Sequence, residues 1–198
     1  DQMTFFGGLR TTGGVQLLYG TGNNGLLFDF GIPHNALIGA SYVFTLDPVR
    51  PTPSRAIRQY VLGRMAPPLP GIYDIEQSQL LEHNVMEKVW NGLKFPHYEN
   101  ISLFIGHMHQ DHMALLPYAR EGITVYMHED AYALYRAIVA SGEYGDTKAN
   151  IVPLEDLAIV DFGRFKMQLI EMDHNTPGAS GIIIESQDRV IAFTGDWR

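Results

Sequence analysis

Four potential metal ligands lie within six residues, in the stretch Gly106-His107-Met108-His109-Gln110-Asp111-His112. Imidazole nitrogens and carboxylate oxygens are the donors that zinc accepts in a protein without cysteines, and this sequence has none. Three such donors and a water make an open, catalytic site, whereas four exceed what one such ion takes. The stretch therefore predicts two metal ions, about 3.5–4 Å apart, that share a water or hydroxide and act on a phosphoryl or acyl group.

The segments on either side of this motif predict where its side chains lie. The apolar run at 101–105 predicts a buried strand, and Met113 to Arg120 predicts a short helix ended by Gly122, with Pro117 making its first turns irregular. Ligand sites of open α/β sheets lie at the carboxyl ends of strands. The simpler interpretation is a set of polar residues on an exposed turn, but the spacing and these flanks favour the metal site.

This motif resembles that of the metallo-β-lactamase superfamily of binuclear hydrolases. The resemblance implies that His107 and His109 bind a first metal and that Asp111 and His112 bind a second. It also implies a zinc cofactor, two ions per complete site, with manganese or iron as alternatives. Asp111 is the predicted catalytic residue, because it would orient the nucleophile or pass its proton to the leaving group.

Three more residues match positions that the family uses outside the main motif, and each follows an apolar, strand-like run. His174 is similar to the third ligand of the first metal, and Asp196 is similar to the carboxylate that bridges both metals. Asp29 is similar to the aspartate that supports the metal loop from behind the ligands. Taken alone, these would be a loop histidine, a strand-end cap and a turn residue, but their shared order favours the site.

The other histidines match no motif position, and we interpret them as ordinary surface or core residues: His34, His83, His97 and His128. Asp173 is the weaker downstream carboxylate, and we expect it to support the site at most from behind the ligands.

The residues around the downstream ligands point to one branch of this superfamily. The segments 173–180 and 194–198 are similar to those of the β-CASP nucleases and their ribonuclease J-like relatives, where an aromatic residue and an arginine follow the bridging aspartate. Gly106 departs from that pattern, because those nucleases usually carry Ser or Thr there.

The family's final histidine has no counterpart before Arg198. We therefore expect an incomplete, weaker second metal site and interpret the chain as the amino-terminal portion of a longer protein; a short natural chain with one metal or a borrowed ligand is the alternative. The fold class implied is α/β (α+β), a metallo-β-lactamase-like αββα sandwich incomplete at its carboxyl end. It would span 1–198, with a helical insertion at about 33–100.

Periodicity and turn residues predict the remaining elements. They are strands between Thr4 and Gly31 with a hairpin turn at Gly22–Gly25, helices at Ser54–Met65, Glu76–Trp90 and Asp130–Ala140, and three strands within Phe165–Asp196 around a Gln187-Asp188 turn.

The composition bears on the expected cellular compartment of the protein and on whether it binds nucleic acid. No window approaches the roughly 18–20 apolar residues of a membrane span, and the start lacks a signal peptide, so cytoplasm is the default expectation. The formal net charge of −8, with 14 Lys+Arg against 22 Asp+Glu, argues against a broadly basic surface for nucleic acid.

The function that the sequence predicts is a binuclear zinc-dependent hydrolase that uses a metal-bound hydroxide on a phosphodiester, as RNA and DNA nucleases do. A thioester or lactone hydrolase of the same superfamily would share every ligand, and a non-catalytic scaffold is a third alternative. A flavodiiron-type redox protein is disfavoured, because that branch carries an acidic residue where this chain has Gln110.

Overall fold

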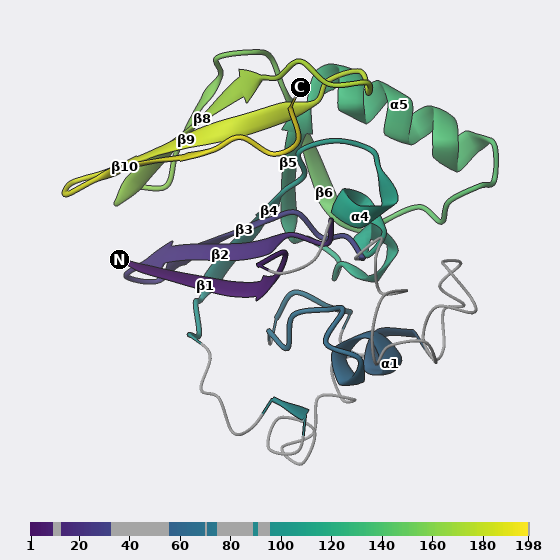
Figure 1. Cartoon of the computed structure of the whole chain (residues 1–198), viewed down its shortest axis with the longest axis horizontal. Coiled ribbons are helices and arrows are strands. Elements are labelled where there is room, and N and C mark those ends of the chain that lie inside the picture. Colours follow the sequence, from purple (N-terminus) through teal and green to yellow (C-terminus); the bar gives the residue numbers. More distant parts are fainter. Residues whose placement is uncertain (10–12, 33–55, 70, 75–88, 91–95, 198) are drawn as a thin grey trace.

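The computed structural model describes residues 1–9, 13–32, 56–69, 71–74, 89–90 and 96–197. These residues form three layers: a set of short helices, a six-stranded sheet and a four-stranded sheet (Figure 1). Two stacked sheets with helices against one of them agree with the predicted fold class, and the described ranges supply three of the four layers of an αββα sandwich.

The six-stranded sheet is mixed, and its strands follow chain order: β1 (Gln2–Gly7), β2 (Gln16–Thr21), β3 (Asn24–Phe28), β4 (Asn100–Phe104), β5 (Thr124–His128) and β6 (Asn150–Leu154). The first three strands pair antiparallel, whereas β3 to β6 pair parallel. The hairpin between β2 and β3 turns at Gly22 and Asn23, as predicted. Since β3, β4 and β5 are parallel, their carboxyl ends meet at one edge, where the metal motif begins.

The four-stranded sheet is antiparallel, in the order β10 (Val190–Phe193), β9 (Ser180–Ser186), β8 (Phe165–Glu171) and β7 (Ile159–Asp161). The three strands predicted here are confirmed as β8, β9 and β10. The backbone N–H of Ser186 donates to the Arg189 carbonyl at 2.9 Å and closes the turn between β9 and β10. The three-residue strand β7 was not predicted.

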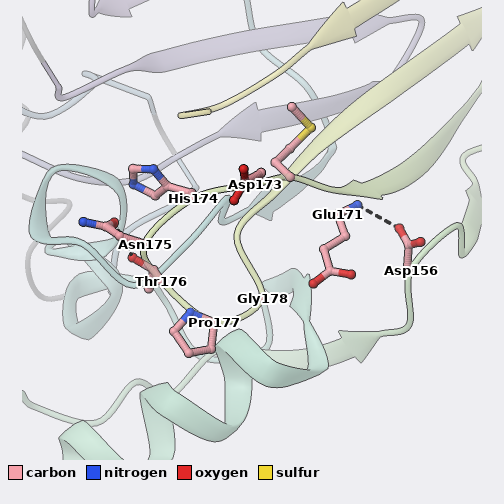
Figure 2. A pocket seen from close by; sticks show the side chains of 9 residues that line it. Asp156, Glu171, Asp173, His174, Asn175, Thr176, Pro177 and Gly178 are labelled. Carbon is pink, nitrogen blue, oxygen red and sulfur yellow. Dashed lines mark hydrogen bonds between the residues drawn. The ribbon is translucent and has the colours of Figure 1, made fainter. Parts of the chain in front are cut away.

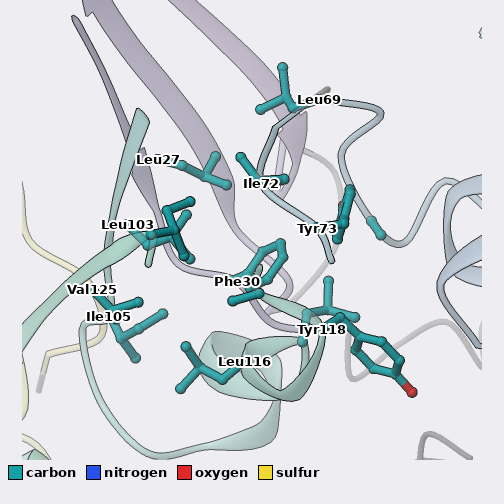
Figure 3. Packing of buried hydrophobic residues seen from close by; sticks show 14 of the residues in the cluster. Leu27, Phe30, Leu69, Ile72, Tyr73, Leu103, Ile105, Leu116, Tyr118 and Val125 are labelled. Atoms are coloured by element: carbon teal, nitrogen blue, oxygen red, sulfur yellow. The ribbon is translucent and has the colours of Figure 1, made fainter. Parts of the chain in front are cut away.

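Strand alternation divides the apolar residues between two cores. Leu17, Tyr19 and Phe28 point toward the second sheet and pack with Phe165 and other residues of β8 and β9. The neighbouring residues of these strands, such as Leu27, face the opposite side of the sheet, where the helices lie. They belong to the cluster that Figure 3 shows around Leu27, Phe30, Leu103, Leu116 and Tyr118. The inner strands β2, β3 and β4 thus have buried residues on both faces, which fixes the strand ends that carry the predicted ligands.

The helices whose bounds the described residues give are α1 (Ala56–Leu62), α4 (Gln110–Met113), the 3-10 turn η2 (Leu116–Tyr118) and α5 (Glu129–Ala140). The helix predicted at Asp130–Ala140 is confirmed as α5, and α1 lies within the predicted Ser54–Met65 helix, although Ser54 lies outside the described residues. Nearly all of the predicted Glu76–Trp90 helix also lies outside them. No helix in the described ranges has the length and apolar character needed to cross a membrane.

The helix predicted at Met113–Arg120 is wrong in its position. Helix α4 begins earlier, at Gln110, and ends at Met113. The chain cannot continue as a regular helix, because Leu115 N–H donates to the Phe30 carbonyl at 2.8 Å and Pro117 has no N–H to donate. Asp111 and His112 therefore lie on a short helix rather than on the loop that was predicted.

Residues 29–32 run alongside the metal motif and hold it in place. Phe30 N–H donates to the His112 carbonyl at 2.7 Å, and Ile32 N–H donates to the Gln110 carbonyl at 3.3 Å. Between them, a Cβ placed on Gly31 would lie 1.9 Å from the carbonyl carbon of Asp111. Only glycine allows this backbone contact.

Gly31→Ala should therefore lower the free energy of unfolding by about 1–3 kcal/mol, because the added methyl group meets backbone that cannot move aside. Gly145→Ala is the matched control, since a Cβ there would meet Pro117 at an ordinary 3.6 Å. Urea unfolding of both variants measures the difference; equal stabilities would show that the chain shifts freely at Gly31.

Candidate metal centre

The predicted ligands converge on one place from three separate segments of the chain. His107 and His109 follow β4, and His112 lies on α4. His174 lies on the loop between β8 and β9, where Figure 2 shows its ring, and Asp196 follows β10. The structure thus brings together side chains that are far apart in sequence.

The first group contains His107, His109 and His174, one ring nitrogen from each lying within 4.8 Å of the others. The His107 Nε2 and His109 Nδ1 atoms are 2.8 Å apart. The ring of His174 lies 4.7 Å from that of His107 and 5.3 Å from that of His109, centroid to centroid. These are the three histidines that the sequence predicts for the first metal.

The second group contains His107, His112 and Asp196, again with one ligand atom from each within 4.8 Å of the others. His112 Nε2 lies 3.3 Å from Asp111 Oδ2 and 3.5 Å from Asp196 Oδ2. The same Asp196 oxygen lies 3.9 Å from His174 Nε2, in the first group. Asp196 therefore lies between the groups, where a bridging carboxylate is expected.

Asp29 holds the motif from behind, and its carboxylate is fully buried. One oxygen accepts the Gly106 N–H at 2.8 Å, and the other lies 2.7 Å from His112 Nδ1. This contact leaves His112 Nε2 facing Asp111 and Asp196, on the side of the ring where a ligand atom is needed. Asp29 has a backbone φ of 54°, a left-handed conformation that non-glycine residues adopt mainly where surrounding contacts enforce it.

Both ring nitrogens of His174 are buried without a hydrogen-bond partner among the described residues, and His112 Nε2 faces only the carboxylates of Asp111 and Asp196. Buried polar atoms are normally satisfied, so such atoms call for a partner of another kind. A divalent cation accepts imidazole lone pairs and carboxylate oxygens together, and this donor set fits it.

The two buried histidines at the centre have opposite pKa shifts. Burial and the neighbouring charge of His112 lower the pKa of His107 to about 3. Burial also lowers the pKa of His112, but the charge of Asp29 and hydrogen bonds to Asp111 and Asp29 outweigh it and raise that pKa to about 11. Without metal, His107 is therefore neutral and His112 protonated near neutral pH.

These shifts predict a pH optimum for the stability of the metal-free chain. Below pH 6.5, the ordinary histidine value, unfolding lets His107 take up a proton that the folded state excludes, so stability falls. His112 stabilises the fold fully below pH 6.5 and loses this contribution as the pH rises toward 11. We expect the contribution of the pair to be largest near pH 6.5.

Urea unfolding between pH 4 and 9 in the presence of a chelator measures this contribution as the difference between the wild type and a His107→Asn, His112→Asn double variant. A difference that stays constant across this range would show that neither histidine is perturbed in the folded chain.

Two residues that touch the predicted ligands were missed by the sequence analysis. Thr176 Oγ1 lies 3.0 Å from His109 Nε2. Gly13, at φ 72°, packs against Asp111 so closely that a Cβ would lie 2.2 Å from its Oδ2 atom. Glycine next to glycine in a loop is a turn signal, but no sequence pattern shows which distant side chain the turn meets.

Of the other residues named in the sequence analysis, those that the structure describes belong to neither group. His97 and Asp173 are exposed. His128 is buried and caps α5, because its Nδ1 accepts the Asp130 N–H at 3.1 Å. His34 and His83 lie outside the described residues.

Comparison with known proteins gives sequence similarity to ribonuclease J and structural similarity to the metallo-β-lactamase fold. No family model matches the chain. It is 28% identical to ribonuclease J of Mycoplasma genitalium and 27% identical to that of Mycoplasma pneumoniae, in each case over 99 residues. The match covers 49% of this chain and only 17% of each ribonuclease J.

Among solved structures, a protein of unknown function from Enterococcus faecalis V583 superposes with a TM-score of 0.76 at 22% identity, over 99% of this chain and 43% of that one. The metallo-β-lactamase fold protein YhfI of Bacillus subtilis gives a TM-score of 0.50 at 14% identity, over 99% and 63%. The chain therefore has the metallo-β-lactamase fold, and about half of its length is similar in sequence to ribonuclease J.

Proposed function

We propose that this chain carries the metal centre of a binuclear hydrolase that acts on phosphodiesters. The observation that carries the proposal is the convergence of five predicted residues in two overlapping groups, with both ring nitrogens of His174 buried at the centre without a hydrogen-bond partner among the described residues. In the proposed assignment, His107, His109 and His174 would hold the first ion. Asp111, His112 and Asp196 would hold the second; His112 and Asp196 belong to the second group, and Asp111 Oδ2 lies 3.3 Å from His112 Nε2. Zinc suits these donors, with manganese or iron as alternatives.

Divalent ions bound there would supply Lewis acidity and lower the pKa of a water, which makes a nucleophile available at neutral pH. The chain's own residues perform the other tasks. Asp111, which is 4% exposed, presents Oδ2 toward His112 and would orient the nucleophile or pass its proton to the leaving group. Asp29 keeps His112 aligned through Nδ1.

The phosphodiester substrate is supported by the similarity to ribonuclease J. A centre with two divalent cations also suits a phosphate group, because the ions concentrate positive charge where the anion must lie. The net charge of −8 opposes a long nucleic-acid contact on this chain. We therefore propose that only a few nucleotides contact this chain near the metal centre. Any longer stretch of nucleic acid would bind elsewhere than on this acidic surface.

A thioester or lactone hydrolase is the second candidate, and the pocket beside the centre favours it. This pocket has a volume of about 690 Å³ and includes His174 and Thr176 together with three carboxylates, Asp156, Glu171 and Asp173 (Figure 2). Carboxylates repel a polyanion but tolerate a neutral ester.

Metal titration followed by a substrate panel tests the proposal. Zinc should bind the full chain and raise its melting temperature, since a ligand that binds only the folded state stabilises it. The loaded chain is then assayed with bis(p-nitrophenyl) phosphate, single-stranded RNA, a thioester and a lactone, beside a His107→Ala, His174→Ala variant.

Turnover of the phosphodiesters by the wild type alone supports the proposal. Turnover of the thioester or lactone alone replaces it with the second candidate. Failure to bind zinc, manganese or iron, or binding without turnover of any substrate, contradicts a hydrolase centre in this chain.

A further inference from the structure

We propose that Thr176 is a positioning residue that fixes the ring of His109, so that His109 Nδ1 is the atom offered to the first metal. This inference rests on the proposed function, because it concerns how one of the proposed ligands is oriented. It assigns a role to a side chain that matches no ligand position in the sequence.

The contacts of the His109 ring place its two nitrogens in different surroundings. Nδ1 lies 2.8 Å from His107 Nε2, within the first group of ligands. Nε2 lies 3.0 Å from the Thr176 hydroxyl oxygen. Thr176 is 8% exposed, so water has little access to compete for this contact. The ring is therefore held at the nitrogen away from the centre.

A second contact of the hydroxyl group determines which partner carries the proton. Thr176 Oγ1 donates to the side-chain carbonyl oxygen Oδ1 of Asn175 at 3.3 Å, an atom that can only accept. With its proton directed to Asn175, the hydroxyl oxygen is left to accept from His109. His109 Nε2 must then carry hydrogen, and Nδ1 keeps the lone pair that a metal needs.

The loop that contains Thr176 is itself held firmly. Met172 N–H donates to the Ala179 carbonyl at 2.8 Å and closes the loop, and Ala179 N–H donates to the Thr176 carbonyl at 3.2 Å. Gly178, at φ 68°, lies so close to the start of α5 that a Cβ would be 2.3 Å from the Ala131 nitrogen. Figure 2 shows this part of the loop beside the helix.

The same loop carries His174, so it would supply one ligand of the first metal directly and orient another through Thr176. Residues behind metal ligands typically change metal affinity by about 10–100-fold when they are removed. Loss of the hydroxyl group alone should therefore weaken the first metal site, even though Thr176 does not contact the ion.

Two substitutions separate the hydroxyl group from the shape of the side chain. Thr176→Val keeps the branched shape without the hydroxyl, and Thr176→Ser keeps the hydroxyl. Zinc titration of the full chain against a competing chelator should give a dissociation constant about 10–100-fold weaker for the Val variant. The Ser variant should bind close to the wild-type value.

Thr147→Val is the matched control for a purely structural loss. Thr147 Oγ1 donates to the Leu116 carbonyl at 2.8 Å and accepts the Ala149 N–H at 3.1 Å, and Thr147 belongs to neither ligand group. This variant should lose stability while keeping its zinc affinity. Equal weakening in the two Val variants would overturn the proposal, because the effect would then be one of general stability.

A measurement without metal distinguishes failure of this inference from failure of the proposed function. Nitrogen-15 spectra of the histidines in the metal-free chain should show His109 protonated at Nε2 in the wild type and in Thr176→Ser. The Thr176→Val variant should show a mixture of tautomers. The same tautomer in all three overturns the role of Thr176, whereas a wild-type chain that shows this tautomer but binds no zinc contradicts the metal centre instead.

Discussion

Asp111→Asn should abolish most hydrolysis while leaving the fold and the first metal largely intact. The carboxylate is buried, and its Oδ2 atom lies 3.3 Å from His112 Nε2. The amide keeps the shape but loses the charge that would hold the second metal and the capacity to take up a proton. Removal of a positioned acid or base typically costs about 10²–10⁴-fold in rate, and we expect the loss in kcat to lie in that range or above.

The measurement combines turnover with metal content for each variant, so that lost metal is not mistaken for lost proton transfer. Asp188→Asn is the control, since this exposed carboxylate lies in the turn between β9 and β10, at the other end of β9 from the loop of His174. If Asp111→Asn retained near-normal turnover on every active substrate, the binuclear mechanism would be wrong, and a mononuclear or non-hydrolytic role would replace it.

The convergence of the predicted residues could be foreseen because Asp29, His107, His174 and Asp196 each follow a short apolar strand. Strands such as β4 and β8 are marked by continuous or alternating apolar residues, and parallel pairing brings the ends of β3 and β4 to one edge. Gly106 and Asp29 come together for this reason, although 77 sequence positions separate them. A local pattern thus predicts a distant contact when the sheet topology is known.

Other features depend on contacts that leave no local pattern. Helix α4 begins inside the ligand motif because residues 29–32 bond to its backbone, so its first residue follows from tertiary contacts rather than from helix propensity. Strand β6 contains Pro153, which an interior strand would exclude, and it is tolerated because β6 is the edge of the sheet. Thr176 touches His109 across 67 positions, and only the folded loop shows this contact.

The glycine at 106, which departs from the Ser or Thr of the similar nucleases, has a local structural reason in this chain. A Cβ there would lie 3.1 Å from the Ser180 carbonyl oxygen and 3.3 Å from Asp29 Oδ1. Both distances are tighter than ordinary contacts, and the second involves the oxygen that accepts the Gly106 N–H. Glycine thus lets the backbone approach the Asp29 carboxylate without displacing it.

Asp29→Ala should be strongly destabilising in the metal-free chain. The carboxylate and His112 are both buried, and their 2.7 Å contact pairs a protonated imidazole with its counter-ion. Without Asp29, the Gly106 N–H would lose its acceptor and the His112 charge would lose the nearest of its carboxylate partners, and loss of one member of a buried ion pair costs about 3–5 kcal/mol. Alanine also fits poorly at the φ of 54° that Asp29 adopts, which adds to the loss.

Two variants separate these causes in urea unfolding with a chelator present. Asp29→Asn keeps an acceptor for the Gly106 N–H but removes the charge, so it should lower the free energy of unfolding by less than Asp29→Ala does. This decrease should become smaller as the pH rises, because His112 then loses its proton. Asp161→Ala is the exposed control, because Asp161 also accepts a glycine N–H, that of Gly163 at 2.7 Å. It should lower the free energy of unfolding by only about 0.5–1.5 kcal/mol. Similar losses for Asp29→Ala and Asp161→Ala would mean that His112 is not held as a charged partner, and Asp29 would then orient the metal motif through the Gly106 backbone alone.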